Sequence, residues 1–430
     1  GARMNKLVYW MIFPTFLVTQ PLSNPSQVQV PLTADSSYAS QIGTQDHFFV
    51  SIPSNPNVYQ PIVTYSDPEL SQKIGEIKPD TPFTVDQLFV NDQGKFVFKL
   101  SNKQYVVADQ DQIYEDSILE LTEEKKTMWL TSSFTVYDQP LVNGAKSKKT
   151  SLAPYSKVEI TKTAKTLKGT YLEISGQGWI SKDELSATDN RMEKVQEILN
   201  QKYNKDGIAV YVKQVDTRKI AGIHEDQEMY SASIAKLLYL YYTQKEVNES
   251  HVDLQTPLKY TKEVNDYPGA YEPEGSGSIS KTPDDKEYIV ADLINRVAKE
   301  SDNVAQNILG YYVTHQSDKK FQKVTNKIAG KTWNVETRMA SPKMAGNVME
   351  AIYQQNGGII DALSETRFDD QRISKDIPVK VAHKIGDAYD FRHDVAIVYT
   401  ESPFILAIFT DHSDYETISA IAKDIYEVLQ

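Results

Sequence analysis

A serine and a lysine stand three residues apart in the segment YSASIAKLLYLYY, which has the pattern of a helix start. Residues three apart on a helix share one face, so the amine of Lys236 would lie beside the hydroxyl of Ser233. A serine hydroxyl becomes an effective nucleophile when a neighbouring base takes its proton, and a lysine with a lowered pKa can act as that base. The spacing therefore predicts nucleophilic catalysis by Ser233.

Two further short motifs follow along the chain. The tripeptide Ser-Asp-Asn at residues 301–303 lies between two helical patterns, where its hydroxyl and amide could relay a proton and hold a substrate amide. The tripeptide Lys-Ile-Gly at residues 384–386 leads into a strand-rich segment. Its lysine supplies positive charge, and its glycine would let a substrate backbone lie close along the strand edge. The three motifs together indicate acyl transfer.

Each motif taken singly is common. Ser317 and Lys320 repeat the first spacing, and residues 73–75 repeat the Lys-Ile-Gly tripeptide. We interpret both repeats as solvated surface turns, because neither stands in order with the other motifs. The order is informative: the serine–lysine pair comes at a helix start, the second motif lies between helices, and the third precedes a strand.

This ordered set resembles the motifs of class A β-lactamases and penicillin-binding proteins. The flanking segments are similar too: RMEKVQEILNQKYNKDGIAVYVKQVDT resembles the first helix and strand of that family, and FRHDVAIVYTESPFILAIFT the two strands after its third motif. The resemblance covers residues 190–430. Strand patterns at both ends of this segment, with helices between them, indicate an antiparallel sheet flanked by helices. We therefore expect an α/β (α+β) fold of the β-lactamase and transpeptidase type, with a helical subdomain.

The resemblance implies a catalytic role for four residues. Ser233 would be the acylated nucleophile and Lys236 its general base. Ser301 would protonate the leaving amine. Lys384 would attract the carboxylate of the substrate.

The resemblance also implies a set of substrate-binding residues. Asn303 would bind the substrate amide, and Arg392 would assist in binding the carboxylate. Ile385 and Gly386 belong to the strand along which the substrate would lie. The backbone N–H of Asp387, with that of the nucleophile, would form the oxyanion hole.

Two features depart from the pattern of the family. Ile385 replaces a Thr or Ser, which removes a hydroxyl that would bind the substrate carboxylate. The family's Glu-x-x-Leu-Asn loop, whose glutamate activates the deacylating water, has no counterpart between Asn303 and Lys384, where Glu336 is the nearest candidate. We therefore expect a shortened loop and slow release of a β-lactam from the acyl-enzyme. His383 either tunes the local field or packs in the core.

Residues 46–188 contain a diverged internal repeat. VYQP at residues 58–61 recurs as VYDQP at residues 136–140, and both copies hold short alternating runs such as KFVFKL and GTYLEI. Alternation with a period of two is typical of half-buried strands. We expect two small all-β barrels, at residues 46–120 and 121–188.

A Gly-Trp pair ends a strand in the second copy, where the first copy has Tyr105. It resembles the bacterial Src-homology-3-like repeats that bind cell walls. Under this interpretation the β region is a wall-binding module. The alternative is that Tyr105 and Trp179 are core aromatics at equivalent positions.

An apolar run, LVYWMIFPTFLV, follows Lys6 near the start of the chain. Its length is typical of a signal peptide and short for a membrane span. We expect residues 1–20 to be a signal peptide or a membrane anchor. The chain would then contact a membrane only through this segment. Residues 21–45, rich in Pro, Ser, Gln and Thr, would be a linker. A buried strand or helix is the alternative for the apolar run.

The formal net charge of −12 argues against nucleic acid as a partner, because phosphate binding needs clustered Lys and Arg. The chain has no cysteine, which excludes a disulfide framework, a thiolate zinc site and a cysteine nucleophile. The sequence implies no metal and no cofactor.

The expected function is that of a cell-envelope serine acyl-hydrolase, secreted or anchored on the extracellular face of a Gram-positive bacterium. Its partners would be peptidoglycan or teichoic acid, with D-alanyl amides or esters as substrates, and β-lactams would acylate it. Two alternatives are a β-lactamase that hydrolyses β-lactam antibiotics and a weakly catalytic wall-binding or sensor protein.

Overall fold

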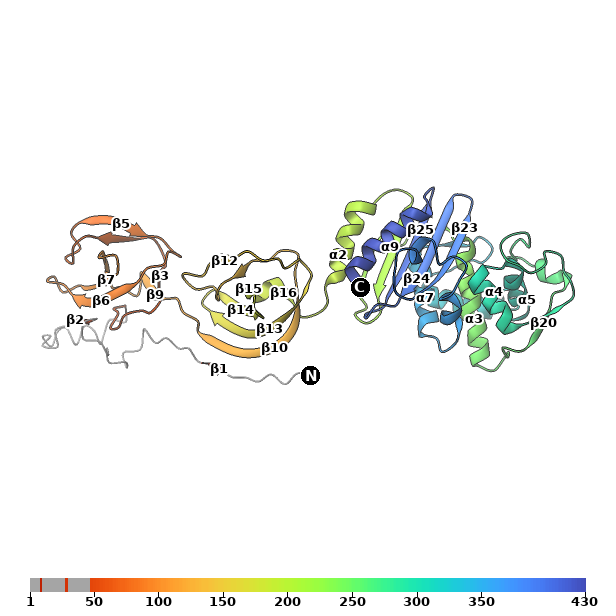
Figure 1. Ribbon diagram of the computed structural model, residues 1–430, viewed down its shortest axis with the longest axis horizontal. Coiled ribbons are helices and arrows are strands. Elements are labelled where there is room, and N and C mark those ends of the chain that lie inside the picture. Colours follow the sequence, from red (N-terminus) through yellow and green to blue (C-terminus); the bar gives the residue numbers. More distant parts are fainter. Residues whose placement is uncertain (1–7, 10–27, 30–46) are drawn as a thin grey trace. The chain divides into compact units, whose positions relative to one another are not determined.

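The computed structural model describes Val8–Tyr9, Val28–Gln29 and residues 47–430, which divide into two compact units, Gly1–Asn190 and Arg191–Gln430 (Figure 1). The expected signal peptide or anchor and the expected linker lie outside the described residues, apart from those two short strands. In the described part of the chain, no helix is both long enough and apolar enough to cross a membrane.

The N-terminal unit consists of several antiparallel sheets, with one further short strand that joins in parallel. The first sheet has the order β2-β6-β7-β8-β4-β5, and a separate pair is formed by β3 and β9. The strands are β2 (Val28–Gln29), β3 (Pro56–Val58), β4 (Ile62–Tyr65), β5 (Lys73–Ile77), β6 (Val85–Val90), β7 (Phe96–Leu100), β8 (Tyr105–Val107) and β9 (Ile113–Glu115).

The second large sheet curls into a half-barrel. Its order is β1-β10-β13-β14-β15-β11-β12, and β16 pairs with β10. Its strands are β1 (Val8–Tyr9), β10 (Glu120–Leu130), β11 (Val136–Tyr137), β12 (Ser147–Lys148), β13 (Lys157–Thr166), β14 (Gly169–Ile174), β15 (Gly178–Ser181) and β16 (Leu185–Ser186); the turn η1 (Lys182–Glu184) precedes β16. The expected all-β region is confirmed, whereas its Src-homology-3-like identity stays a prediction.

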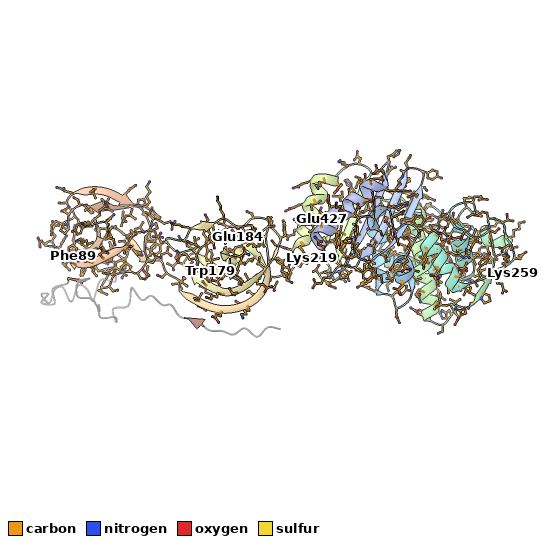
Figure 2. The ribbon with its side chains drawn as sticks, in the orientation of Figure 1. Phe89, Trp179, Glu184, Lys219, Lys259 and Glu427 are labelled. Carbon is orange, nitrogen blue, oxygen red and sulfur yellow. The ribbon has the colours of Figure 1, made fainter. Side chains whose placement is uncertain are left out.

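The two aromatic residues of the repeat lie in different surroundings. Trp179 lies in the half-barrel (Figure 2). Its side chain is buried and packs in a cluster with Ala164 and Tyr171. Tyr105 is half-buried and meets the Phe89 ring edge-on. Trp179 therefore contributes to the core, as the alternative interpretation of the Gly-Trp pair expected.

The C-terminal unit is built on a five-stranded antiparallel sheet with the order β18-β17-β25-β24-β23. The strands are β17 (Ile208–Gln214), β18 (Ile220–Ile223), β23 (Val381–Ala388), β24 (Phe391–Val398) and β25 (Phe404–Asp411). Every residue of β17 is buried, and alternate residues contribute to two separate cores. Both faces of the sheet are therefore covered, as the alternation of side chains along a strand requires.

Helices cover the two faces. The first and last helices, α2 (Arg191–Ile198) and α9 (Tyr415–Leu429), share a core with one face, and α7 (Pro342–Gln354) packs on the other. α2 continues into the short helix η2 (Leu199–Tyr203). This arrangement confirms the expected antiparallel sheet flanked by helices.

The helical part surrounds α3, which is buried along most of its length. Its other elements are the helices α4 (Val290–Glu300), α5 (Asn303–Tyr312), α6 (Lys319–Ala329) and α8 (Ile359–Leu363), the turns η3 (Ala232–Ala235), η4 (Lys262–Asn265) and η5 (Arg372–Ser374), and the short pairs β19 (Met229–Tyr230) with β22 (Met339–Ala340) and β20 (Pro257–Lys259) with β21 (Glu287–Ile289). The turn η3 leads directly into α3 (Lys236–Asn248), and it lies against strand β23.

The contact between η3 and β23 depends on a glycine. A Cβ atom on Gly386 would lie 2.9 Å from the backbone nitrogen of Ile234 and 2.9 Å from the carbonyl oxygen of Ser231. These distances are shorter than a side chain tolerates, so only glycine lets the strand approach the turn this closely. The glycine of the third motif thus brings the strand beside the serine of the first.

Candidate active site

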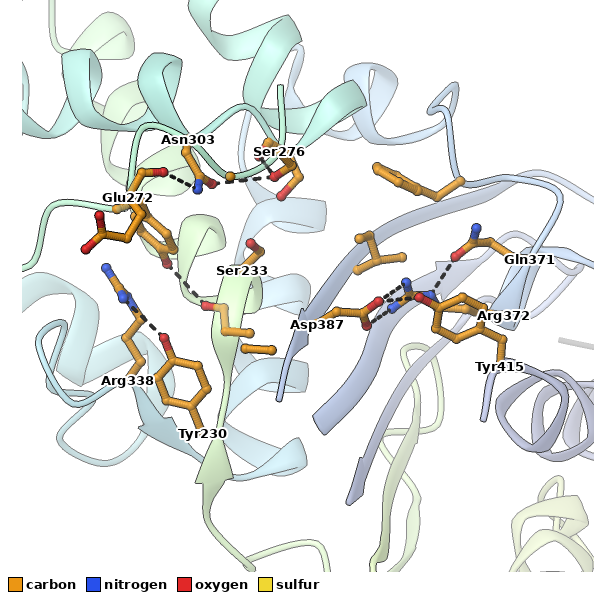
Figure 3. A pocket seen from close by; sticks show the side chains of 17 residues that line it. Tyr230, Ser233, Glu272, Ser276, Asn303, Arg338, Gln371, Arg372, Asp387 and Tyr415 are labelled. Carbon is orange, nitrogen blue, oxygen red and sulfur yellow. Dashed lines mark hydrogen bonds and ion pairs between the residues drawn. The ribbon is translucent and has the colours of Figure 1, made fainter. Parts of the chain in front are cut away.

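A cavity of about 420 Å³ opens in the C-terminal unit (Figure 3). Its walls come from the turn η3, a segment from Tyr271 to Ser276, the start of α5, residues 368–372 and strand β23. The cavity therefore lies where the helical part meets the edge of the sheet. Five of the residues that the sequence predicted for the site line it: Ser233, Ser301, Asn303, Ile385 and Asp387.

Lys236, the first residue of α3, is fully buried beneath this cavity's lining. Its Nζ donates hydrogen bonds to the Ser301 carbonyl oxygen (2.7 Å), to Ser301 Oγ (3.0 Å) and to Asn303 Oδ1 (2.6 Å). Among the described contacts, no hydrogen bond joins this amine to Ser233 Oγ. Catalytic hydrogen bonds are often long before substrate binds and tighten afterwards. In this structure Ser301 is the immediate partner of the amine.

Lys384, on strand β23, reaches the same hydroxyl from the sheet. Its Nζ donates to Ser301 Oγ (2.9 Å) and to the carbonyl oxygen of Ile385 (2.8 Å), and its side chain is buried. The Ser301 hydroxyl is therefore in hydrogen-bond contact with two buried amines. A hydroxyl can accept two hydrogen bonds and donate one, so it can pass a proton between an amine and a third group.

Burial lowers the pKa of both amines, because an ammonium group loses its hydration when it leaves water. For Lys236, burial is the main cause and the positive charge of Lys384 adds to it, so the pKa lies well below its usual value. For Lys384, burial and the charge of Arg372 lower the pKa to about 7, against the opposing effects of Asp394 and Asp387. Neutral amines are thus accessible near neutral pH, as a general base requires.

The Ser-Asp-Asn segment is held in an uncommon backbone conformation. Ser301 ends α4 in the left-handed region, with φ of 56°. The buried Asp302 carboxylate accepts hydrogen bonds from the backbone N–H groups of Ala305 (2.9 Å), Ser278 (2.8 Å) and Ile279 (3.0 Å). The carboxylate caps α5 and fixes the loop that precedes it, which offsets the backbone strain. Asp302 is therefore structural and positions the residues on either side.

Asn303 also reaches across the cavity wall. Its Oδ1 accepts from Lys236, and its Nδ2 donates to the carbonyl oxygen of Glu272 (2.8 Å). An amide NH2 group has a second hydrogen, so Nδ2 retains donor capacity for a substrate carbonyl. The geometry agrees with the substrate-binding role expected for Asn303.

The structure does not bring Arg392 into the cavity. Although Arg392 is the register partner of Asp387 across β23 and β24, its Nη1 donates to the carbonyl oxygen of Ser413 (2.9 Å). Arg372 lines the cavity in its place and forms a bidentate ion pair with Asp387. No motif marks Arg372 in the sequence, because it lies in an irregular segment before β23.

Sequence reasoning also missed groups on the opposite wall. The Arg338 guanidinium stacks on the Tyr271 ring, 3.7 Å from its centroid, and donates to Tyr230 Oη (3.3 Å) and to the carbonyl oxygen of Gly269 (2.8 Å). Glu272 lines the cavity and is exposed. Arg338 is half-buried and Glu272 exposed, and neither belongs to a motif, so the sequence offered no signal for either.

The candidate deacylation glutamate and the second serine–lysine spacing both lie outside the cavity. Glu336 is exposed and lines a separate small hollow beside Trp333. The interpretation of Ser317 as a solvated turn is wrong: its side chain is buried and Ser317 Oγ shares a hydrogen bond with Tyr239 Oη (2.9 Å), whereas Lys320 is exposed. The hydroxyl of a tyrosine on α3 needs a buried partner, and Ser317 supplies it.

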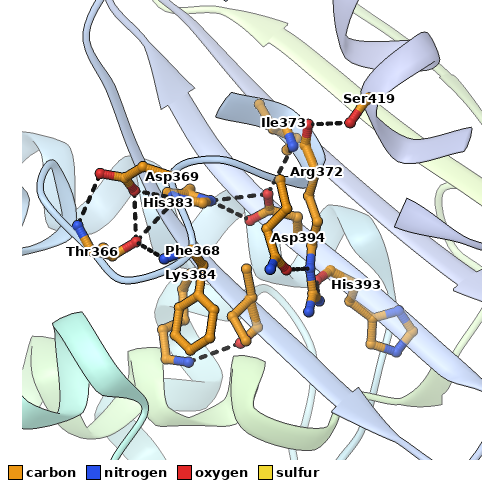
Figure 4. A network of polar contacts seen from close by, with 12 residues as sticks. Thr366, Phe368, Asp369, Arg372, Ile373, His383, Lys384, His393, Asp394 and Ser419 are labelled. Carbon is orange, nitrogen blue, oxygen red and sulfur yellow. Dashed lines mark hydrogen bonds and ion pairs between the residues drawn. The ribbon is translucent and has the colours of Figure 1, made fainter. Parts of the chain in front are cut away.

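A buried polar network lies behind strand β23 (Figure 4). The His383 ring contacts Asp394 through Nδ1 (3.0 Å) and Asp369 through Nε2 (2.9 Å). Burial by itself lowers the pKa of His383, but the Asp394 and Asp369 carboxylates outweigh it and raise the pKa to about 9. Asp394 Oδ2 also accepts from the backbone N–H of Ile373 (3.1 Å). The imidazolium therefore ties β23 to the segment that carries Arg372.

The first prediction concerns the pH dependence of acylation. Because the neutral amine is the form that accepts a proton and burial lowers the pKa of Lys236 well below its usual value, labelling of Ser233 by a fluorophosphonate should level off far below pH 10.5, where an ordinary lysine loses its proton. Replacing Lys236→Met removes the base without changing the side-chain volume much, so labelling should fall by about 10⁴-fold or more. Lys320→Met is the matched control and should label like the parent. A parent rate that keeps rising up to about pH 10.5, as an ordinary lysine would give, would contradict the assignment.

The second prediction concerns the imidazolium of His383. Its pKa is higher in the folded protein than in the unfolded chain. Its contribution to the stability of the folded state is therefore complete below about pH 6.5 and is lost as pH rises through about 9. This increase in the pKa of His383 corresponds to about 3 kcal/mol in the free energy of unfolding. Hydrogen exchange of residues 366–373, corrected for intrinsic rates, should lose protection over this window. His383→Gln should abolish that pH dependence, whereas His412→Gln, on an exposed histidine, should retain it. Equal protection of these residues at about pH 6 and at pH 10 in the parent would refute this stabilising role of His383.

The comparisons with known proteins concern the C-terminal unit. Residues 190–429 match the model of the β-lactamase enzyme family. Two similar solved structures are a protein named PBP-A (17% identity, TM-score 0.47, covering 56% of this chain and 96% of that one) and a β-lactamase from Sphaerobacter thermophilus DSM 20745 (16% identity, TM-score 0.44, covering 56% and 94%). A third is the TLA-1 extended-spectrum β-lactamase (18% identity, TM-score 0.45, covering 56% and 99%).

A variant of PBP-A has been solved as its acyl-enzyme complex with penicillin G, at 18% identity and a TM-score of 0.46, covering 56% of this chain and 96% of that one. No curated protein sequence matches the chain. The family model nevertheless covers more than half of the 430 residues, including all three motifs. Through residues 190–429, this chain belongs to the β-lactamase enzyme family.

Proposed function

We propose that this protein is a serine acyl-hydrolase of the cell envelope that forms an acyl-enzyme on Ser233 with D-alanyl amides or esters. One observation carries the proposal: the Ser301 hydroxyl lies within 3.0 Å of two buried lysine amines, at the wall of a cavity that Ser233 also lines. Buried lysines without a carboxylate partner are costly, and such groups cluster where chemistry needs a shifted pKa.

The acylation step follows from this geometry. Ser233 Oγ attacks the acyl carbon while its proton passes to the amine of Lys236, directly or through the hydroxyl of Ser301. The bond to the leaving nitrogen or oxygen then breaks, and Ser301 donates a proton to that atom and regains one from a neighbouring lysine. The backbone N–H groups of Ser233 and Asp387 would stabilise the oxyanion.

The release of the acyl group is expected to be slow for β-lactams. General-base activation of the deacylating water is typically worth about 10²–10⁴-fold. Glu336 lies outside the cavity, and the Asp387 carboxylate is occupied by Arg372. Glu272 lines the exposed wall of the cavity, across from the Asp387 side (Figure 3). The cavity thus supplies an acylating apparatus and little that would speed deacylation.

The third prediction tests the nucleophile and the lifetime of the acyl-enzyme. Mass spectrometry after incubation with penicillin G should place the adduct on Ser233, and the adduct should persist for about minutes or longer. Ser233→Ala should prevent labelling, whereas Ser317→Ala, in the other serine–lysine spacing, should leave the adduct in place.

Two outcomes would favour the alternatives. Steady nitrocefin hydrolysis at about ten per second or faster would identify a β-lactamase and refute slow deacylation. A stable adduct without turnover of any D-alanyl ester or amide would identify a weakly catalytic sensor. Release of D-alanine from an alanyl ester or from a D-alanyl-D-alanine peptide, lost in Ser233→Ala, would support the proposal.

We propose that the N-terminal unit targets the enzyme to the cell wall. A hollow of about 400 Å³ on this unit is lined by Tyr59, Tyr65, Gln60 and Asp111, among others, and the Tyr59 ring is 55% exposed and packs against the Tyr114 ring. Exposed aromatic faces beside amide and carboxylate groups are typical of sites that orient a polar ligand.

The fourth prediction tests this targeting role. The full chain should sediment with purified Gram-positive cell walls at low salt, and Tyr59→Ala should reduce the bound fraction severalfold because it removes an exposed ring from the hollow. Leu167→Ala, at another exposed apolar residue of the same unit, is the control and should bind like the parent. Binding that is absent, or unaffected by Tyr59→Ala, would leave the unit as a spacer.

A further inference from the structure

The cavity contains an ion pair at the place where the sequence predicted recognition of a substrate carboxylate. The Asp387 carboxylate contacts Arg372 through two hydrogen bonds, from Nη1 (2.6 Å) and from Nη2 (2.8 Å), and accepts a third from the hydroxyl of Tyr415 (Figure 3). Asp387 directly follows the Lys-Ile-Gly motif, and its side chain lines the cavity. The cation nearest this end of β23 is therefore already neutralised by an anion of the protein itself.

The donors of Arg372 are almost fully used. Its Nε donates to Gln371 Oε1 (2.8 Å), and its Nη1 donates to the carbonyl oxygen of His393 (3.0 Å) as well as to Asp387. A guanidinium has five N–H donors. These three hydrogen bonds, together with the one from Nη2 to Asp387, use four of them. A substrate carboxylate could form one hydrogen bond with Arg372 at most, unless it displaced Asp387.

The neighbouring residues of strand β23 offer a carboxylate no free cation in place of Arg372. Ile385 presents methyl groups to the cavity where a hydroxyl would donate. The Lys384 amine is buried and donates to Ser301 and to a backbone carbonyl, and its pKa is lowered to about 7. Arg338 lies across the cavity, beside Glu272 and far from the Asp387 side (Figure 3). An anion at the β23 end would thus lose hydration and meet the like charge of Asp387.

The leaving half of an acyl donor must lie at this end. Ser301, which gives the leaving atom its proton, is held by Lys384 of β23. Asn303, which would hold the amide of the acyl half, faces the opposite wall through its contact with Glu272. The leaving group therefore extends from Ser301 along β23 toward Ile385 and Asp387.

We propose that Asp387 is a specificity-determining residue that selects acyl donors whose leaving half carries no carboxylate. The substrate class is then an ester or amide of an uncharged alcohol or amine, rather than a peptide that ends in a free carboxylate. Ser233 forms the new ester, the bond to the leaving oxygen or nitrogen breaks, and the uncharged alcohol or amine departs with the proton from Ser301. This inference rests on the proposed function and names the substrate class of the same site.

The test compares two donors that differ in a single charge. N-acetyl-D-alanyl-D-lactate carries a terminal carboxylate, and its carboxamide carries none, while both share the acyl group and the scissile ester. The parent should acylate with the carboxamide at a kcat/KM about tenfold or more above that with the carboxylate. Asp387→Asn should bring this ratio to one or below, because it removes the negative charge, keeps the shape and leaves the Arg372 guanidinium without its carboxylate partner. Asp387→Glu retains the charge and should retain the preference.

The ratio of two kcat/KM values on one preparation does not depend on the fraction of folded enzyme, so partial unfolding of a variant cannot imitate the effect. If Asp387→Asn does not fold, Asp387→Ser removes the same charge with a smaller side chain. A parent ratio near one, or an unchanged ratio in the charge-removing variants, would overturn the inference while leaving the acyl-hydrolase intact. If neither ester acylates Ser233 in the parent, the proposed function fails and this inference fails with it.

Discussion

The burial of two lysine amines around one hydroxyl is the constraint on which the site depends. Lys236 and Lys384 come from a helix and from a strand, and both donate to Ser301 Oγ, which lies at the end of another helix. Burying a charged ammonium group is costly, and the protein lowers that cost by lowering the pKa of both amines. The arrangement persists because three separate elements hold the amines in position, and its consequence is that the neutral, proton-accepting form of the amines is favoured.

Two backbone features make this convergence sterically feasible. Ser301 adopts a left-handed conformation, which turns its hydroxyl toward both amines, and the buried Asp302 carboxylate fixes that turn through three backbone N–H groups. Gly386 removes the Cβ atom that would separate β23 from the turn η3. A change at Asp302 or Gly386 would therefore act on the chemistry through geometry, without any contact with the substrate.

Charges around the cavity are arranged in pairs that leave little net charge at the sheet edge. Arg372 is matched by Asp387, and His383 is held by Asp369 and Asp394 behind the strand. The two groups are connected, because Asp394 accepts from the residue that follows Arg372. The polar network thus orients the guanidinium, and the guanidinium orients the carboxylate that faces the substrate. Such outer contacts determine the precision of a site as much as the groups that touch the substrate.

The sequence by itself predicted which residues would supply the chemistry, and it determined which kind of fold holds them. A three-residue spacing fixes the relative direction of Ser233 and Lys236 on one turn, and alternation with a period of two identifies strands. These are local properties, so they can be predicted without knowledge of tertiary packing. The antiparallel sheet and the flanking helices follow from such patterns, whereas the meeting of Ser233, Ser301 and Asn303 at one cavity was expected from the resemblance of the ordered motifs to a known family.

Only the tertiary structure decided how the charges pair. Arg392 was expected at the site, but its side chain turns to Ser413, and Arg372 enters from an irregular segment that has no periodicity. Likewise Ser317, expected in solvent, is buried against a tyrosine of α3. The direction of a long side chain depends on the partners within its reach, and those partners come from segments distant in sequence. Local spacing therefore predicts a nucleophile and its base, whereas the burial and pairing of these groups are set by packing between elements.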